Sequence, residues 1–256
     1  MIACGSLCFT QLSFEEACVQ IASLGFDAID VAVMEGWAHF NPSELVEDLN
    51  SALAYAKNSL EKNRLIPVAF NASSKTGDPD LELPRFRAIC DFANILEVPI
   101  ICYGAPAQTE GFENSLKRYG RLLEIAQRHG LTLAVEAHRG TLLERSEVAA
   151  RFCKALDGVY LTFDPSHMYS GPQAGAPFDE VYPYVRHTHW RDSGDDWDDL
   201  QLAVGSGSVD FSGLIQGLQE EGYSGPYSVE YMDTYPNGDH ENITAMKSTL
   251  EKLTTT

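Results

Sequence analysis

The chain has 256 residues, of which 44% are hydrophobic, and carries a formal net charge of −19 at pH 7. This length and composition are typical of one soluble α/β domain, and no stretch is apolar for the roughly 18 residues that a membrane-spanning helix needs. The acidic charge argues against binding to nucleic acid or to an anionic membrane, because phosphate groups attract basic surfaces.

The cysteines and the start of the chain indicate the compartment. The six cysteines are scattered without a CxxC pair, which is typical of reduced, buried thiols. The first ten residues lack a basic segment and are soon followed by Glu15 and Glu16, so we interpret them as a strand and not as a signal peptide. We therefore expect a cytoplasmic protein.

Strand-like and helix-like segments alternate in the first half of the chain. Short apolar segments predict strands over Ile2–Cys8, Phe26–Val33, Leu65–Phe70 and Val98–Tyr103. Apolar residues at helical spacing predict helices from Ser13 to Gly25, over Glu44–Asn63, over Arg85–Leu96 and over Glu113–His129. A capping box at Ser13 and Glu16 supports the first helix, Pro67 is unusual for a central strand, and Asn71–Pro84 reads as a polar loop.

Four strand-like segments follow, and each ends in a residue type that binds metals. They are Leu131–His138, Val159–His167, Val185–Asp192 and Tyr227–Glu230. Helices are expected near Ser146–Leu156, Phe178–Tyr184 and Phe211–Glu221. Units of roughly 32 residues are typical of βα modules. We predict a single (β/α)8 TIM barrel over residues 1–256, with a doubly wound open sheet as the alternative.

The candidate metal ligands in these segments are Glu136, Asp164, His189 and Glu230. Parallel strands of a barrel expose their C-terminal ends on one rim, so these side chains can converge. Carboxylates with one imidazole suit one divalent metal ion, Mn²⁺, Mg²⁺, Co²⁺ or Zn²⁺. Each residue alone is more often a solvated rim residue or a packed histidine, so the prediction depends on the four together.

Other residues were weighed for substrate binding. Alternate residues of a strand share a face, so His138 is expected beside Glu136 and Arg191 beside His189. Aromatic side chains that could stack on a sugar are Trp37, Phe40, Trp190 and Trp197. Gly205–Gly207 reads as a turn. The acidic loop Asp195–Asp199 disfavours a phosphorylated substrate, although Arg139 or Arg191 could reverse this preference.

The sequence resembles the xylose-isomerase-like TIM barrels, the sugar isomerase and epimerase superfamily that includes ketose 3-epimerases, inosose dehydratases and zinc AP endonucleases. The resemblance covers nearly the full length. The segments that carry it are Leu12–Glu16, Leu24–Asp30, Val135–Gly140, Phe163–His167, Thr188–Asp192, Val204–Phe211 and Gly222–Glu230.

The resemblance implies roles for particular residues. It implies that Glu136, Asp164, His189 and Glu230 hold one metal ion. It further implies that Glu136 and Glu230 are the catalytic acid and base, and that His167 binds a substrate oxygen. We also expect His138 and Arg191 to bind substrate. The implied activity is isomerisation or epimerisation of a free ketose, cyclitol or small keto-polyol through an enediolate.

Two departures leave the substrate open. Arg191 stands where lysine is common, and Asp30 stands where glutamate is more usual; both are expected on the substrate side. A metal-dependent lyase of the inosose or dehydroshikimate dehydratase type is the first alternative.

A non-catalytic metabolite-binding barrel or an AP endonuclease is less favoured. No histidine lies in Leu65–Lys75 or Val98–Gln108 to hold further metals. The expected partner is a small sugar-like molecule, with no nucleic acid and no membrane. The sequence leaves the oligomeric state open, a homo-oligomer included.

Overall fold

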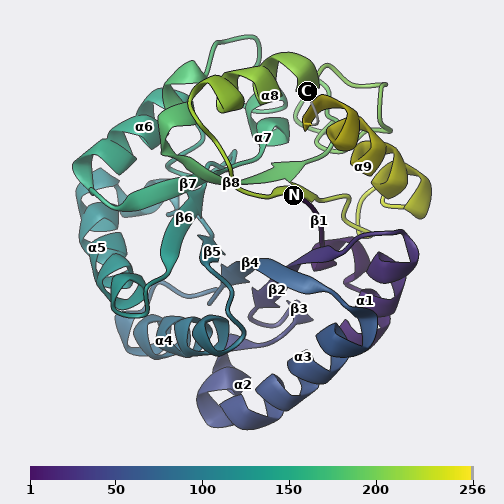
Figure 1. The fold of residues 1–256 in the computed structure, drawn as a ribbon. Helices are drawn as coiled ribbons and strands as arrows, with labels where there is room; N and C mark the ends of the chain where they lie inside the picture. Colours follow the sequence, from purple (N-terminus) through teal and green to yellow (C-terminus); the bar gives the residue numbers. More distant parts are fainter. Residues whose placement is uncertain (255–256) are drawn as a thin grey trace.

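The computed structural model describes residues 1–254 and shows a closed ring of parallel strands surrounded by helices (Figure 1). The ring strands are β1 (Ile2–Gly5), β2 (Ala28–Met34), β4 (Ile66–Ser73), β5 (Ile100–Tyr103), β6 (Thr132–Glu136), β7 (Val159–Phe163), β8 (Val185–Trp190) and β9 (Tyr227–Val229). Strand β1 pairs in parallel with both β2 and β9, which closes the ring. The predicted (β/α)8 barrel is therefore confirmed, and an open sheet is excluded.

Except for the short α7, which follows β7 at the C-terminal rim of the barrel, the helices form an outer layer that follows the ring in chain order (Figure 1). They are α1 (Phe14–Ser23), α2 (Pro42–Glu47), α3 (Leu49–Asn63), α4 (Pro79–Ile95), α5 (Phe112–Arg128), α6 (Ser146–Ala155), α7 (Pro165–Tyr169), α8 (Phe211–Glu220) and α9 (His240–Thr254). Their apolar sides pack on the strands in one large buried cluster. Residues 255–256 of the predicted domain lie outside the described residues, and the domain bounds stay a prediction.

The first half of the helical layer differs from the predicted boundaries. The predicted helix Glu44–Asn63 is divided at Asp48, whose backbone is non-helical (φ −147°, ψ 77°) and whose carboxylate accepts a hydrogen bond from Ser51 N. Helix α4 begins at Pro79 and not at Arg85, because Asp78 caps it and proline is favourable at a first helical position. The capping box at Ser13 is present as predicted.

Three further elements depart from the sequence prediction. Strand β1 ends at Gly5, and the 3₁₀ turn η1 (Ser6–Phe9) replaces the rest of the predicted strand. The segment predicted as a helix near Phe178–Tyr184 is the 3₁₀ turn η3 (Asp179–Tyr184). Helix α9 was not predicted, because it follows a polar segment and its helical spacing went unrecognised.

Pro67 does lie inside a ring strand, β4, where its missing N–H is accommodated by an irregular register. Ile29 pairs with Pro67, but the next residue, Asp30, pairs with Ala69, so Val68 is an extra residue on β4. A bulge of this kind is where a strand tolerates proline. Among the described residues, no helix is both long and apolar enough to cross a membrane.

A buried ion pair joins two helices of the outer layer. Glu82 on α4 is 1% exposed, and Arg118 on α5 donates from Nε to its Oε2 at 2.7 Å and from Nη2 to its Oε1. Tyr103 at the end of β5 also donates to Glu82 Oε1, at 3.1 Å. The guanidinium therefore compensates a carboxylate that has no access to water.

We predict that Arg118→Met destabilises the protein by about 3–5 kcal/mol, because it leaves the Glu82 charge buried without its partner. The matched control is Arg128→Met, which removes an exposed pair with Glu124 whose side chains are 73% and 67% exposed. That control should cost less than about 1 kcal/mol. Urea unfolding of both variants measures the difference, and equal losses would contradict the prediction.

Candidate metal centre and active site

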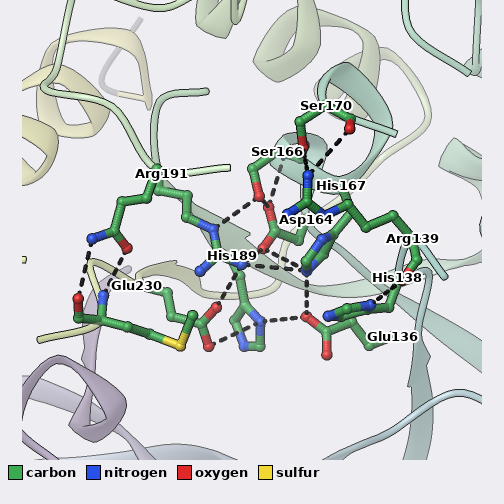
Figure 2. Close-up of polar contacts among 12 residues, drawn as sticks. Glu136, His138, Arg139, Asp164, Ser166, His167, Ser170, His189, Arg191 and Glu230 are labelled. Atoms are coloured by element: carbon green, nitrogen blue, oxygen red, sulfur yellow. Dashed lines mark hydrogen bonds and ion pairs between the residues drawn. The ribbon is translucent and has the colours of Figure 1, made fainter. Parts of the chain in front are cut away.

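The structure brings the four candidate ligands together at the C-terminal rim of the barrel (Figure 2). Glu136 is the last residue of β6, His189 lies near the end of β8, and Glu230 directly follows β9. Asp164 follows β7 and caps α7 through a hydrogen bond from Ser166 N. One donor atom from each of the four lies within 4.8 Å of the others. That they bind a metal stays a prediction.

His189 lies between the two glutamates (Figure 2). Its Nδ1 is 3.4 Å from Glu136 Oε1 and 3.5 Å from Glu230 Oε1. Its other ring nitrogen, Nε2, is 3.0 Å from Asp30 Oδ2. The imidazole therefore presents Nδ1 to the glutamates and Nε2 to the barrel interior.

The charges of the carboxylates interact strongly. Burial, together with the negative charges of Glu136 and Asp164, raises the pKa of Glu230 to about 7, although His189 and Arg191 oppose the shift. Burial also acts to raise the pKa of Glu136, but the hydrogen bond and charge of His189 outweigh it and lower that pKa to about 2. Burial therefore favours the neutral form of Glu230, whereas His189 favours the ionised form of Glu136.

Arg191 is a buried cation within the same cluster. It is 1% exposed; its Nη2 is 2.5 Å from Asp164 Oδ2 and 3.3 Å from Glu230 Oε2, and its Nε donates to Ser166 Oγ at 2.9 Å. Its Nη1 has no hydrogen-bond partner within the described residues. Arg191 therefore neutralises part of the carboxylate charge and keeps one donor group free.

The donor set fits a divalent metal ion. Carboxylate oxygens with one imidazole nitrogen are the ligands that Mg²⁺, Mn²⁺, Co²⁺ and Zn²⁺ accept. Burial is the largest cause of the raised pKa of Glu230, and the negative charges of Glu136 and Asp164 add to it. A nearby cation would favour the ionised carboxylates. The four residues present would hold such an ion.

His138 and His167 lie together beside Glu136. Their ring centroids are 3.7 Å apart. His138 Nδ1 is 2.6 Å from the carbonyl oxygen of Arg139, so Nδ1 carries the proton and Nε2 is the free acceptor. His167 Nε2 is 3.5 Å from Asp164 Oδ2, and its Nδ1 has no partner within residues 1–254. Both rings thus offer an unused nitrogen.

A cavity of about 690 Å³ opens above these residues. Its polar lining comprises Asn71, Glu136, His138, Arg139, His167, Arg191, Glu230 and Thr234, and its apolar and aromatic lining comprises Leu7, Met34, Trp37, Trp197, Leu200, Met232 and Tyr235. Trp37 and Trp197 are therefore placed to contact a bound molecule. Phe40 and Trp190 are not, because both are buried in the core away from the cavity.

Two polar residues of the site were missed or misplaced by sequence reasoning. Asn71 donates from Nδ2 to Glu230 Oε1 at 2.9 Å, yet it was assigned to a polar loop. Strand β4 extends to Ser73, so Asn71 lies near its C-terminal end. The convergence of strand ends on one rim, which placed the four ligands, therefore also predicts Asn71 at the site. Asp30 was expected on the substrate side, which is wrong: it does not line the cavity and contacts His187 and His189 instead.

The turn Gly205–Gly207 and the side chain of Arg139 are both occupied by contacts within the protein. In the turn Gly205–Gly207, the amides of both glycines donate to Asp192 Oδ2 at 2.7 and 3.0 Å. Arg139 donates to Ser170 Oγ at 2.9 Å and lies 4.4 Å over the Trp197 ring. The predicted turn is present, and Arg139 secures the acidic loop beside the cavity.

Comparisons with known proteins agree with this architecture. A family model described as xylose isomerase-like TIM barrel matches residues 18–254. An inosose dehydratase from Yersinia enterocolitica is 29% identical over 133 residues, or 44% of this chain and 45% of that protein. The match thus spans less than half the length of this curated relative.

Two solved structures superpose over most of the chain. A xylose isomerase-like TIM barrel protein from Mycobacterium smegmatis, in complex with magnesium, has a TM-score of 0.80 at 18% identity and covers 98% of this chain and 95% of its own. D-allulose 3-epimerase from Methylomonas sp., in complex with D-allulose, has a TM-score of 0.75 at 16% identity, with 98% and 96% covered. At these identities the likeness shows the fold alone.

We expect the purified chain to retain one divalent ion after loading with Mn²⁺ and desalting. Asp164→Asn removes one charged ligand and should weaken binding by more than the ~10–100-fold that changes around the ligands typically cost. Asp48→Asn is the matched control, because Asp48 also caps a helix, α3, away from the site. Elemental analysis of the three proteins checks this, and equal metal content in all of them would contradict it.

Proposed function

The chain belongs to the xylose isomerase-like TIM barrel family, and from this premise we propose that it is a divalent-metal-dependent isomerase or epimerase. The proposed substrate is a free ketose, a cyclitol or a small keto-polyol. The observation that carries the proposal is the placement of Glu136 and Glu230 on either side of His189, both lining the cavity (Figure 2). Two carboxylates facing one bound substrate are what proton transfer on both faces of a carbon requires.

The metal would supply one part of the chemistry: when bound, it polarises the substrate carbonyl and stabilises the negative charge that develops there. The protein side chains supply the rest. One glutamate removes the proton from the carbon beside the carbonyl, and the other returns a proton to the opposite face. Asn71 holds Glu230 Oε1 at 2.9 Å and so restricts the direction in which that carboxylate faces.

The remaining polar groups would position substrate hydroxyls. His138 Nε2 is a free acceptor, whereas Arg191 Nη1 is a donor that no described residue uses. A polyol needs both kinds of group along its length. Arg139 and Arg191 are otherwise engaged with protein atoms, which favours a neutral substrate over a phosphorylated one.

A lyase is the second candidate, supported by the similarity to an inosose dehydratase. Removal of the same proton becomes dehydration when a leaving hydroxyl lies β to the carbanion. Turnover in D₂O separates the two reactions. Epimerisation incorporates deuterium without loss of water, whereas dehydration produces an absorbing enone.

The proposal predicts that Glu136→Gln and Glu230→Gln each lower kcat by ~10²–10⁴-fold, because glutamine cannot accept a proton at neutral pH. The substrate is first identified with a panel of ketoses and cyclitols, and rates are measured at saturating Mn²⁺. Glu110→Gln serves as the control, since Glu110 pairs with Arg118 on the outer layer. Wild-type rates in either site variant would refute the two-carboxylate mechanism.

For His167→Ala we expect a higher KM with a smaller loss in kcat than in the glutamine variants, because a group that positions a hydroxyl mainly orients the substrate. His129→Ala is the comparison, as His129 lies on the outer layer and pairs with Asp91. Steady-state kinetics of both variants measure KM and kcat. An unchanged KM in His167→Ala would remove this residue from the substrate site.

A further inference from the structure

A buried polar triad lies directly beneath the candidate metal centre. Asp30 on β2 accepts through a single oxygen, Oδ2, from His187 Nε2 at 2.7 Å and from His189 Nε2 at 3.0 Å. All three residues are at most 1% exposed. We propose that Asp30 is the positioning residue of the metal centre: it holds His189 with Nε2 protonated, so that Nδ1 is the metal-binding atom.

The hydrogen-bond geometry favours this tautomer, because Nε2 lies 3.0 Å from Asp30 Oδ2 whereas Nδ1 lies 3.4 Å from Glu136 Oε1. A neutral imidazole has one N–H and one bare nitrogen, and a carboxylate oxygen can only accept. When Asp30 Oδ2 takes the Nε2 proton, the lone pair of His189 lies on Nδ1, the nitrogen that faces Glu136 Oε1 and Glu230 Oε1 at 3.4 and 3.5 Å. Metal-binding histidines commonly rely on such a carboxylate partner. The inference rests on the metal site of the proposed function.

An irregular strand pairing precedes His187 of the triad. The register of β2 against β4 shifts between Ile29 and Asp30, and that of β7 against β8 shifts between Leu161 and Thr162, so that Thr162 pairs with His187. Bulges redirect the side chains that follow them. Here the second shift leaves Arg186 as an extra residue on β8 just before His187, whereas the extra residue of the first shift, Val68, is on β4 and leaves the alternation of β2 unchanged.

The triad is an unfavourable arrangement for the stability of the fold. Asp30 Oδ1 and His187 Nδ1 have no hydrogen-bond partner within the described residues, although both are buried. Burying a charged group that is only partly hydrogen-bonded is unfavourable. A residue that acted only in folding would be expected to have both oxygens satisfied, so the arrangement points to the orientation of His189.

The triad also offers donor atoms to a cation of its own. The distances between these donor atoms argue against a second metal ion. Asp30 Oδ2 lies at hydrogen-bonding distance from both imidazoles, so the would-be ligands are already bonded to one another. Two Mn²⁺ ions per chain, one of them lost in an Asp30 variant, would show a second metal site and overturn the proposal.

The test compares Mn²⁺ binding by wild type, Asp30→Asn and Thr162→Val, using calorimetry on the full chain. Asp30→Asn should weaken binding by ~10–100-fold while leaving the melting temperature of the metal-free protein unchanged or higher. Thr162→Val is a matched control, because Thr162 is also buried in the barrel interior with an unpartnered hydroxyl. Its dissociation constant should equal that of wild type.

Nuclear magnetic resonance of the Zn²⁺-loaded wild type supplies a readout that does not depend on a variant. His189 should be metal-bound at Nδ1, with a strongly downfield Nε2–H proton. Coordination through Nε2 would overturn the proposal, and so would equal Mn²⁺ affinity in wild type and Asp30→Asn. Failure of the wild type to bind any metal would refute the metal site itself, and the inference with it.

Discussion

Electrostatic repulsion among Glu136, Asp164 and Glu230 is the constraint to which the rest of the site responds. One oxygen of each carboxylate lies within 4.8 Å of the others and of one nitrogen of His189. Carboxylates this close together cannot all remain charged without nearby cations. Arg191 provides one positive charge inside the cluster, with Nη2 2.5 Å from Asp164 Oδ2. Burial nevertheless raises the pKa of Glu230 to about 7, and a bound divalent ion would favour its ionised form.

The residues that stabilise the barrel lie apart from the polar residues of the candidate site. The large apolar cluster lies where the helices pack on the strands, whereas the barrel interior below the rim carries polar side chains. Several of these, including Asp30, Thr162 and Ser228, have buried atoms without partners in residues 1–254. Such groups cost free energy, and burial of the large apolar cluster offsets that cost.

Residues near strand ends could be predicted well from the sequence. Alternate residues of a strand share a face, and the parallel strands of a barrel all end on one rim, so the position of a residue in its strand is enough to place it. The barrel and the meeting of Glu136, Asp164, His189 and Glu230 followed from these rules. The contact of Asp30 with His189 could not, since it joins β2 to β8 across the barrel interior and no local pattern encodes which side chains meet there. Helix ends were also misplaced where a single side chain, such as Asp48 or Asp78, sets the boundary.

Closure of the ring has a consequence for the order of events during synthesis. The four candidate ligands come from the last four ring strands, and β9, which precedes Glu230, pairs with β1, the first ring strand in the sequence. During synthesis, the ring strands up to β8 are therefore made before Glu230 completes the candidate metal site. Metal binding by all four ligands becomes available only once β9 has been made, so an ion that binds the closed barrel would selectively stabilise chains that contain β9 over chains that lack it.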